Sequence, residues 1–150
     1  PIKTFLGRRW IRAAGYYPAR KVRLFRRDKF RYEEAKVHPR ILFDGKCGEL
    51  NGDILHYSWR DLADFFAKFN RETTLEAEKW LEDGRKVSLA NILRKCVDRF
   101  LKNYLLKGGF RDGFIGFLMS FFHSLYQLIS YAKYYETKKG IAAGGLTGSG

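Results

Sequence analysis

Hydrophobic and polar positions change their spacing along the chain, from short alternating stretches at the start to helical stripes further on. In "KVRLFRR", Val22 and Leu24 alternate with basic residues, which is the pattern of a strand with one buried face. Asp44 and Gly45 then predict a tight turn between short strands. The segment "GDILHYSW" predicts a strand that leads into a helix. The first third of the chain is therefore expected to contain short strands and turns.

The middle of the chain predicts two helices. Ser58, with Asp61 three residues later, has the pattern of a helix N-cap. An apolar stripe at helical spacing follows, formed by Leu62, Phe65, Phe66 and Phe69. A second helix is predicted to begin near Thr73 or Thr74 and to end at Gly84, because glycine readily adopts the left-handed conformation that stops a helix.

The last third predicts two apolar helices. Residues 88–106 form an amphipathic pattern, which "KGGFRDG" interrupts. Residues 114–131 then run for 18 positions without a formal charge, close to the ~20 that span a bilayer. Polar side chains dilute this segment, so a helix lying in the membrane interface is favoured over the alternatives of a buried core helix and a true span. The residues expected to contact the membrane are Phe114, Phe117, Leu118, Phe121, Phe122 and Leu125.

These patterns predict an α+β fold, with short strands in the N-terminal third followed by amphipathic helices. We divide the chain into a strand region (1–58), a helical and membrane-associating region (59–136), and a Gly-rich flexible tail (137–150). The chain begins at Pro1 and its only methionine is Met119, which favours a fragment or a processed protein.

The net charge of +13 favours an anionic partner: a nucleic acid, a phosphorylated small molecule or an acidic lipid surface. Cys47 and Cys96 have no metal-binding spacing, and we expect reduced thiols. The sequence contains no Asp-x-Asp, no Gly-rich phosphate loop after a strand and no Gly-x-Ser-x-Gly. His38 and His56 each stand without a nearby His or Cys, so a self-contained catalytic site is not visible.

The most basic segment, residues 20–31, leaves three interpretations open. It could be a solvated edge strand, a site at which one or two arginines bind a phosphate or diphosphate, or a nucleic-acid-binding strand with interleaved aromatic rings. No zinc finger, helix-turn-helix or ribonucleoprotein motif accompanies it.

In their order along the chain, three segments resemble the C-terminal half of bacterial family 2 glycosyltransferases. They are "FLGRRWIRAAGYYPARKVRLFRRDKFRYEEAKVHPRI", "GDILHYSWRDLADFFAKFNRETTLEAE" and "LLKGGFRDGFIGFLMSFFHSLYQLISYAKYYE". The subgroup that they resemble contains lipopolysaccharide-core β-1,4-glucosyltransferases, and the resemblance covers about residues 3–136.

The resemblance implies part of a GT-A fold, a nucleotide-sugar donor and inversion at the anomeric carbon. In such enzymes a carboxylate removes the proton from the acceptor hydroxyl, and Mg²⁺ or Mn²⁺ neutralises the departing diphosphate. Because the donor-binding half with its Asp-x-Asp is absent from this chain, we expect the chain to be inactive alone.

The resemblance also assigns residues to roles. It places cationic side chains and motif histidines at the donor–acceptor cleft: Arg23, Arg26, Arg27, His38 and His56. Either histidine is a candidate metal ligand. Many relatives have glutamate where this chain has Pro39, which leaves Glu33 and Glu34 as candidate bases.

The leading prediction is therefore a fragment of a membrane-peripheral glycosyltransferase at the cytoplasmic face of the bacterial inner membrane. Its expected partners are a nucleotide-sugar donor, a glycan or lipid-linked acceptor and an anionic membrane surface, with oligomerisation as a further option and without nucleic acid. The alternative is a basic, non-catalytic module that binds nucleic acid or anionic membrane.

Overall fold

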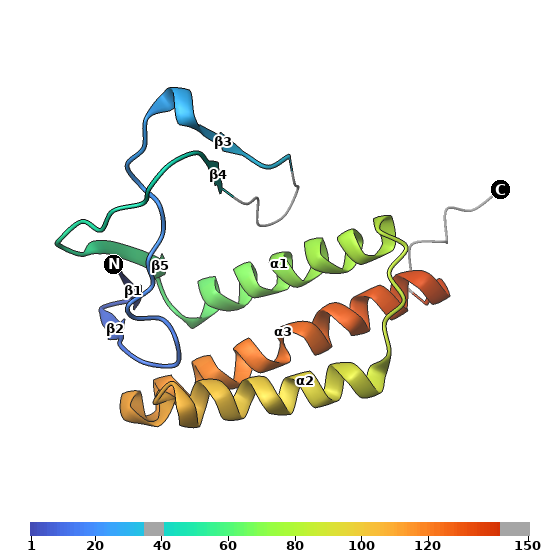
Figure 1. Ribbon diagram of the computed structural model, residues 1–150. Helices are drawn as coiled ribbons and strands as arrows, with labels where there is room; N and C mark the ends of the chain where they lie inside the picture. Colours follow the sequence, from blue (N-terminus) through green and yellow to red (C-terminus); the bar gives the residue numbers. More distant parts are fainter. Residues whose placement is uncertain (35–40, 142–150) are drawn as a thin grey trace.

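The computed structural model describes residues 1–34 and 41–141, and it confirms the predicted α+β class. Five strands precede three long helices in the described chain (Figure 1). The strands are β1 (Ile2–Leu6), β2 (Arg9–Ile11), β3 (Phe30–Tyr32), β4 (Ile41–Phe43) and β5 (Ile54–Trp59). The helices are α1 (Leu62–Glu82), α2 (Leu89–Leu101) and α3 (Gly113–Lys139). Short helical turns occur at η1 (Arg27–Lys29), η2 (Lys102–Leu106) and η3 (Gly109–Asp112), of which η2 is a π-helix.

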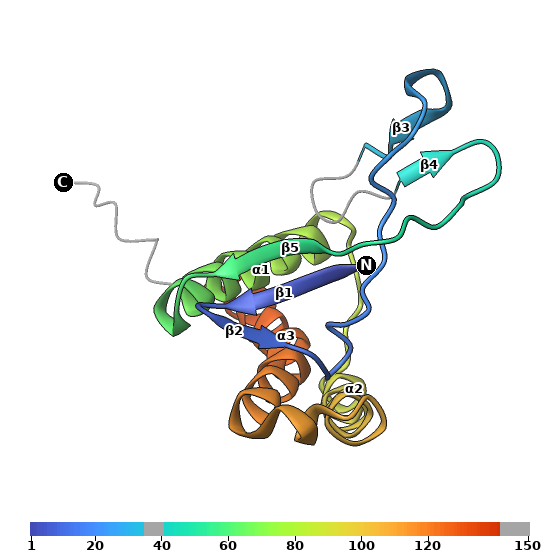
Figure 2. The same ribbon diagram turned by 90° about the vertical axis from the view of Figure 1, so that its left-hand side faces the viewer.

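A three-stranded sheet in the order β2-β1-β5 supports the helices. β1 pairs antiparallel with β2 and parallel with β5. Along β1, Ile2, Thr4 and Leu6 are buried while the residues between them are half-buried. This alternation buries one face of the sheet against the helices, as Figure 2 shows for α1 and α3.

The β3–β4 hairpin projects away from this sheet in both ribbon views (Figures 1 and 2). The strand predicted at residues 21–27 is wrong: β3 begins at Phe30, and Leu24 is 77% exposed. The physical reason is that a strand needs a hydrogen-bonded neighbour, and β4 pairs with Phe30–Tyr32 instead. The ring of Phe25 stacks on that of Phe30, which gives this apolar residue a local partner without a sheet.

The helix predictions need two corrections. Ser58 lies in β5, and Asp61 is the N-cap of α1, where its side chain accepts a hydrogen bond from the backbone N–H of Asp64 at 2.8 Å. The predicted break near Thr73 is also wrong, because α1 is continuous. The hydroxyl of Thr73 donates to a backbone carbonyl of the preceding turn and is thereby satisfied inside the helix. The end of the helix is confirmed, since Gly84 follows it with φ +59°.

α3 packs against both α1 and α2 and carries two clusters of the core. At the sheet end, Leu6 and Ile11 of the strands pack with Phe65 of α1 and Met119 of α3. At the far end, the cluster consists of Ala77, Trp80, Ile92, Cys96 and Tyr134. α3 thus contributes to both clusters, and the cluster at the sheet end joins the strands to the helices.

Candidate functional site

His56 lies on β5, and its ring Nδ1 is 2.7 Å from the hydroxyl oxygen of Ser58. It is exposed, although its cross-strand neighbour Thr4 is buried. This exposure leaves the imidazole accessible to a ligand.

The residues that follow His56 in the "HYSWRD" motif build the start of α1. Asp64 accepts hydrogen bonds from the backbone N–H of Arg60 at 3.0 Å and from the Lys68 ammonium at 2.9 Å. The Arg60 hydrogen bond, followed by that of Lys68, lowers the pKa of Asp64 below its ordinary value. Asp61 serves as the helix cap. Asp61 of the motif and Asp64, three residues after it, therefore stabilise the start of α1.

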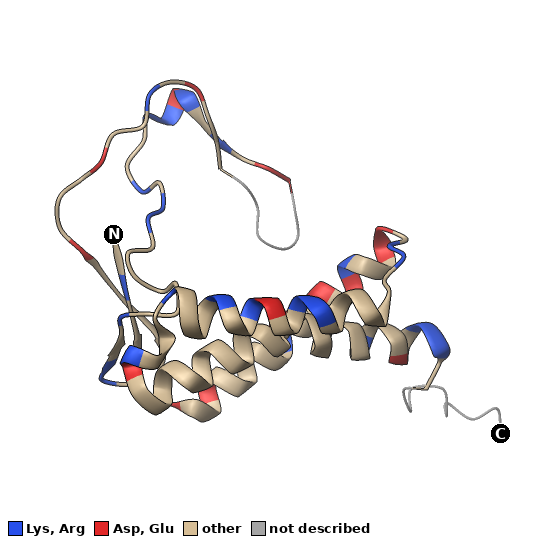
Figure 3. Cartoon of the chain, turned by 60° about the horizontal axis from the view of Figure 1, so that its bottom comes forward, with Lys and Arg blue, Asp and Glu red and all other residues tan. Residues whose placement is uncertain are grey.

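The arginines predicted to bind a diphosphate lie in the exposed segment that leads into the β3–β4 hairpin. Arg23, Arg26 and Arg27 are all exposed, and Arg26 pairs with Asp28 at 3.3 Å. Within the described residues, no hydrogen bond or ion pair joins these arginines to His56. Figure 3 shows basic residues recurring along this projecting segment, whereas the helical layer has long stretches without charge.

The carboxylates predicted as bases follow β3. Glu33 is half-buried and Glu34 is exposed. His38 lies outside the described residues, so the prediction for it stays a prediction.

The described residues provide few ligands for a divalent cation. Among residues 1–34 and 41–141, no group of three His, Cys, Asp or Glu side chains is placed to hold a metal ion. His56 would be a single ligand, whereas Mg²⁺ and Mn²⁺ favour several oxygen ligands. This donor set does not fit such an ion by itself, and the predicted Mg²⁺ or Mn²⁺ stays a prediction.

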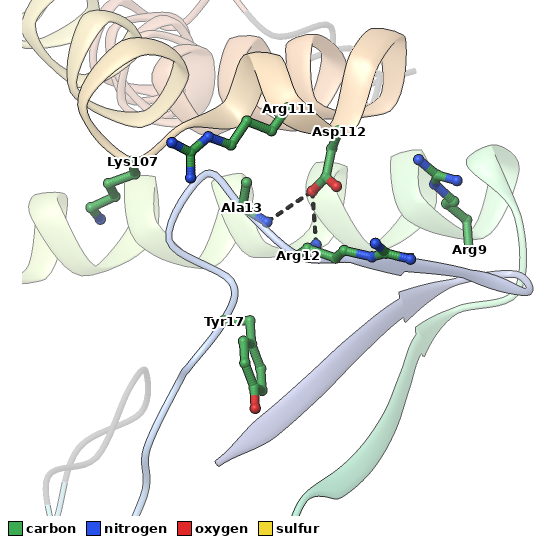
Figure 4. Close-up of a pocket in the computed structure, with 7 residues that line it drawn as sticks. All are labelled: Arg9, Arg12, Ala13, Tyr17, Lys107, Arg111 and Asp112. Atoms are coloured by element: carbon green, nitrogen blue, oxygen red, sulfur yellow. Dashed lines mark hydrogen bonds between the residues drawn. The ribbon is translucent and has the colours of Figure 1, made fainter.

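A second cluster of cations, which the sequence analysis did not identify, surrounds a pocket of about 490 Å³. We call it the basic pocket, and its lining residues are Arg9, Arg12, Ala13, Tyr17, Lys107, Arg111 and Asp112. Figure 4 shows that its cations come from two distant parts of the chain. Arg9 and Arg12 belong to β2 and the loop after it, and Lys107 and Arg111 to the connection between α2 and α3.

Asp112 holds the two sides of the basic pocket together. Its Oδ2 accepts hydrogen bonds from the backbone N–H groups of Arg12 at 2.7 Å and Ala13 at 2.8 Å (Figure 4). The Asp112 residue is only 5% exposed. On the helical side, η3 packs closely on the start of α3 because Gly116 has no side chain: a Cβ there would lie 1.8 Å from the carbonyl oxygen of Gly109. The signal for this junction in the sequence is "KGGFRDG", which the pattern identified only as a helix break.

A second carboxylate, Asp53, lies near the basic pocket but is already neutralised. Its Oδ2 is 2.8 Å from the Lys3 ammonium, and its Oδ1 accepts a hydrogen bond from the Tyr17 hydroxyl at 3.1 Å. The Lys3 hydrogen bond lowers the pKa of Asp53, and the same bond raises the pKa of Lys3. Asp53 and Lys3 therefore stay ionised as a pair, and Asp53 adds no net negative charge beside the pocket.

The helical layer also presents exposed apolar side chains. We define the apolar helical face as Leu93, Val97, Leu101, Phe117 and Phe121, all of which are exposed. α2 turns only part of its apolar stripe toward α3, because Ile92 and Cys96 are buried while the stripe continues onto the surface.

The residues predicted to contact a membrane are placed differently from one another. Phe114, Phe117 and Phe121 are exposed, whereas Leu118 and Leu125 are half-buried. Phe122 is also half-buried, and its ring contacts the rings of α1, namely Phe65, Phe66 and Phe69. This packing leaves Phe122 little surface to offer to a membrane.

By length and composition, one described helical segment, Gly109–Lys139, is apolar enough to cross a membrane. Its central part packs against α1 and α2 in this structure.

Comparison with known proteins shows that the chain is similar to bacterial glycosyltransferases. The chain is 30% identical over 129 residues to the lipopolysaccharide core biosynthesis glycosyltransferase LpsC of Rhizobium meliloti. The match covers 81% of this chain and 48% of LpsC. It is also 29% identical over 91 residues to an uncharacterized glycosyltransferase of Rickettsia prowazekii, covering 61% of this chain and 31% of that protein.

The predicted resemblance to glycosyltransferases is confirmed. The chain spans about half the length of LpsC and less of the Rickettsia glycosyltransferase. No known protein-family model matches it, and no solved structure matches it.

Proposed function

We propose that this chain is part of a membrane-peripheral glycosyltransferase that transfers a sugar from a nucleotide-sugar donor to a lipid-linked or lipopolysaccharide-type glycan. The observation that carries the proposal is the 30% identity to LpsC over 81% of the chain. The assignment to family 2, the partial GT-A fold and the cytoplasmic face of the inner membrane belong to the same proposal.

The proposed reaction is a single displacement with inversion. The acceptor hydroxyl oxygen forms a bond to the anomeric carbon while the bond from that carbon to the diphosphate breaks. The hydroxyl proton passes to a carboxylate, for which Glu33 and Glu34 are the candidates on this chain. Exposed arginines of the segment before β3 would stabilise the charge that accumulates on the departing diphosphate, because guanidinium groups bind phosphate oxygens in a forked geometry.

His56 is the candidate on the sheet for a contact with the substrate. Its imidazole is exposed and its orientation is set by the hydroxyl of Ser58 at 2.7 Å. We assign it a hydrogen bond to the diphosphate or to the sugar. A divalent cation would help to neutralise the leaving group in the intact enzyme, and its further ligands would come from outside the described residues.

The membrane part of the proposal is supported by the apolar helical face. A group of exposed apolar side chains at a protein surface is typical of an interaction site. The chain's net charge of +13 would add attraction to an anionic leaflet. A nucleic-acid-binding module would use the cations but would leave the apolar helical face without a role, so this alternative is not favoured.

The test is sugar transfer by the gene product that carries this chain, purified with all of its flanking sequence. Radiolabelled nucleotide sugars would be offered with truncated lipopolysaccharide as acceptor, with Mg²⁺, with Mn²⁺ and with a chelator. We expect transfer that depends on the acceptor, with a product anomer opposite to that of the donor. The variant His56→Ala is expected to reduce the rate by roughly 10²-fold or more, as for the loss of one donor to a developing charge, and Lys95→Ala on the exposed side of α2 serves as its control.

Absence of transfer with every donor and acceptor, together with tight binding of RNA, would instead establish the non-catalytic alternative. Retention of the anomeric configuration would exclude the single displacement. Equal rates for His56→Ala and the control would remove His56 from the site.

A further inference from the structure

The basic pocket carries more positive than negative charge, with four cations and one carboxylate in its lining. Its cations are Arg9, Arg12, Lys107 and Arg111. None of them forms an ion pair within residues 1–34 and 41–141. The only carboxylate in the lining, that of Asp112, is already bound to two backbone N–H groups. An anion with several acceptor oxygens is the ligand that such a set of donors favours.

The side chain of Lys107 lies close to the backbone at Gly15, beside the pocket. A Cβ at Gly15 would lie 2.7 Å from the Lys107 Nζ, so the side chain runs directly over this glycine. The backbone N–H of Ala14 donates to the carbonyl of Lys107 at 3.0 Å and fixes the same junction. Lys107 is exposed, and its side chain lies against Gly15 at the edge of the pocket.

Exposed apolar side chains occur in the same connection and in the first turn of α3. We call Leu105, Leu106, Phe110 and Phe114 the apolar tip. Leu106 is 84% exposed, Phe114 71% and Phe110 50%. In the sequence these residues alternate with the pocket cations, since Lys107 follows Leu106 and Arg111 follows Phe110. Positive charge and apolar surface thus occur at the same end of the α2–α3 pair.

The apolar tip is continuous with the apolar helical face. The ring centroids of Phe110 and Tyr104 are 6.4 Å apart, those of Tyr104 and Phe117 5.9 Å, and those of Phe117 and Phe121 5.9 Å. The Arg111 guanidinium lies 5.8 Å from the Phe110 ring, at the border between this aromatic row and the pocket. One surface therefore combines an apolar band with cations at its rim.

We propose that the basic pocket binds the headgroup phosphate of an anionic phospholipid while the apolar tip inserts into the same bilayer. In a membrane, phosphate groups lie just above the hydrocarbon, so neighbouring residues of one connection can reach both layers. A soluble phosphate would satisfy the cations but would leave the apolar tip in water. The inference deepens the membrane-peripheral part of the proposed function.

This docking also orients the protein. In Figures 1 and 2, the connection between α2 and α3 and the β3–β4 hairpin lie at opposite ends of the molecule. A bilayer bound at the connection therefore leaves the arginine-rich hairpin facing the aqueous phase, where a soluble nucleotide sugar can reach it.

The test of the pocket compares two double variants of equal charge. Arg12→Gln/Arg111→Gln removes two pocket cations, and Arg71→Gln/Lys86→Gln removes two exposed cations of α1 and the α1–α2 loop. Binding is measured by co-sedimentation with vesicles of phosphatidylcholine alone and of phosphatidylcholine with phosphatidylglycerol. At about 1 kcal/mol per basic residue at an anionic surface, the pocket variant should bind phosphatidylglycerol vesicles about thirtyfold more weakly. The control variant should lose less than about threefold, because its charges lie away from the membrane.

The test of the apolar tip uses exposed positions whose substitution leaves the core intact. Leu106→Ser/Phe114→Ser should weaken binding to both kinds of vesicle. In a second experiment, the fluorescence of Leu106→Trp should shift to shorter wavelength on addition of phosphatidylglycerol vesicles. Circular dichroism of every variant should match that of the unaltered chain. A pocket variant with altered helix content is replaced by the single substitution Arg111→Gln, and an apolar-tip variant by Leu106→Ser alone.

Three results would overturn the proposal. If the pocket and control variants lose vesicle binding equally, the binding is non-specific electrostatic attraction to the membrane. Binding of inorganic phosphate that Arg12→Gln/Arg111→Gln abolishes, together with vesicle binding that the same variant leaves unchanged, would identify a site for a soluble anion. Pocket-dependent binding of RNA in preference to vesicles would identify a nucleic-acid site. Sugar transfer to a soluble acceptor is measured separately without vesicles, so failure of membrane docking and failure of the proposed function give different results.

Discussion

The contribution of Asp112 to stability can be measured, because this residue joins the α2–α3 connection to the loop after β2. The perturbation is Asp112→Ala, which removes the acceptor of two backbone hydrogen bonds, at 2.7 Å from Arg12 and 2.8 Å from Ala13. A hydrogen bond to a charged group contributes about 1.5–3 kcal/mol. Because both bonds are only partly buried, we take the lower value for each and expect a loss of about 3 kcal/mol in the free energy of unfolding.

The variant Asp112→Asn separates the charge from the geometry. The amide oxygen of asparagine can still accept both hydrogen bonds, so only the charge is lost and the expected cost is about 1 kcal/mol. Asp98→Ala is the control, since its carboxylate is exposed and lies 3.7 Å from Arg94 in a surface ion pair. Such pairs contribute between about 0 and 1 kcal/mol.

The assay is thermal and urea unfolding followed by the far-ultraviolet circular dichroism of the helices. For a chain of this size, 1 kcal/mol corresponds to about 2–4 °C in Tm, so Asp112→Ala should lower Tm by roughly 6–12 °C. A change within about 0.5 kcal/mol of the unaltered chain, or equal effects of Asp112→Ala and Asp98→Ala, would refute the role assigned to Asp112.

Two further predictions concern the packing of α3. Gly116→Ala would place its Cβ 1.8 Å from the carbonyl oxygen of Gly109, so we expect the cooperative unfolding transition to be lost. The control is Gly84→Ala, which has φ +59° and no atom near the added Cβ, and which should cost only about 1 kcal/mol. A Gly116→Ala variant that unfolds cooperatively with an unchanged Tm would contradict the packing. Lys133→Met would remove an ammonium that lies 2.6–2.9 Å from four oxygen atoms of α1, and we expect a loss of about 1–3 kcal/mol in urea unfolding. Lys95→Met on the exposed side of α2 is the matched substitution, and equal midpoints for the two lysine variants would show that the contact to α1 contributes nothing.

Several elements could be predicted from the chain because their signals are local. The strand Ile54–Trp59 follows from the segment "GDILHYSW", and Gly84 ends α1 because a left-handed residue stops a helix. The interruption at "KGGFRDG" is equally local, since adjacent glycines weaken a helix wherever they occur. The resemblance to glycosyltransferases was also carried by short motifs in order, and the match to LpsC agrees with it.

Other elements depended on neighbours that a pattern does not contain. The alternation of Val22 and Leu24 met the rule for a strand, but no strand in the described part of the chain pairs with it. Thr73 met the rule for a helix start, but its hydroxyl is satisfied by a carbonyl of the same helix. In both cases the sequence rule considers one segment alone, whereas the structure that forms depends on the hydrogen-bond partner of that segment.

By itself the sequence determined the α+β class, the amphipathic character of the helices and the excess of positive charge. Only the tertiary structure brought Arg12 next to Asp112, which are 100 positions apart, and so assembled the basic pocket. It also decided which apolar residues became exposed, placing Phe122 against α1 and leaving Phe114 at the surface. The physical reason is that amphipathicity is a property of one helix, whereas a pocket or an exposed face is a property of how several elements pack.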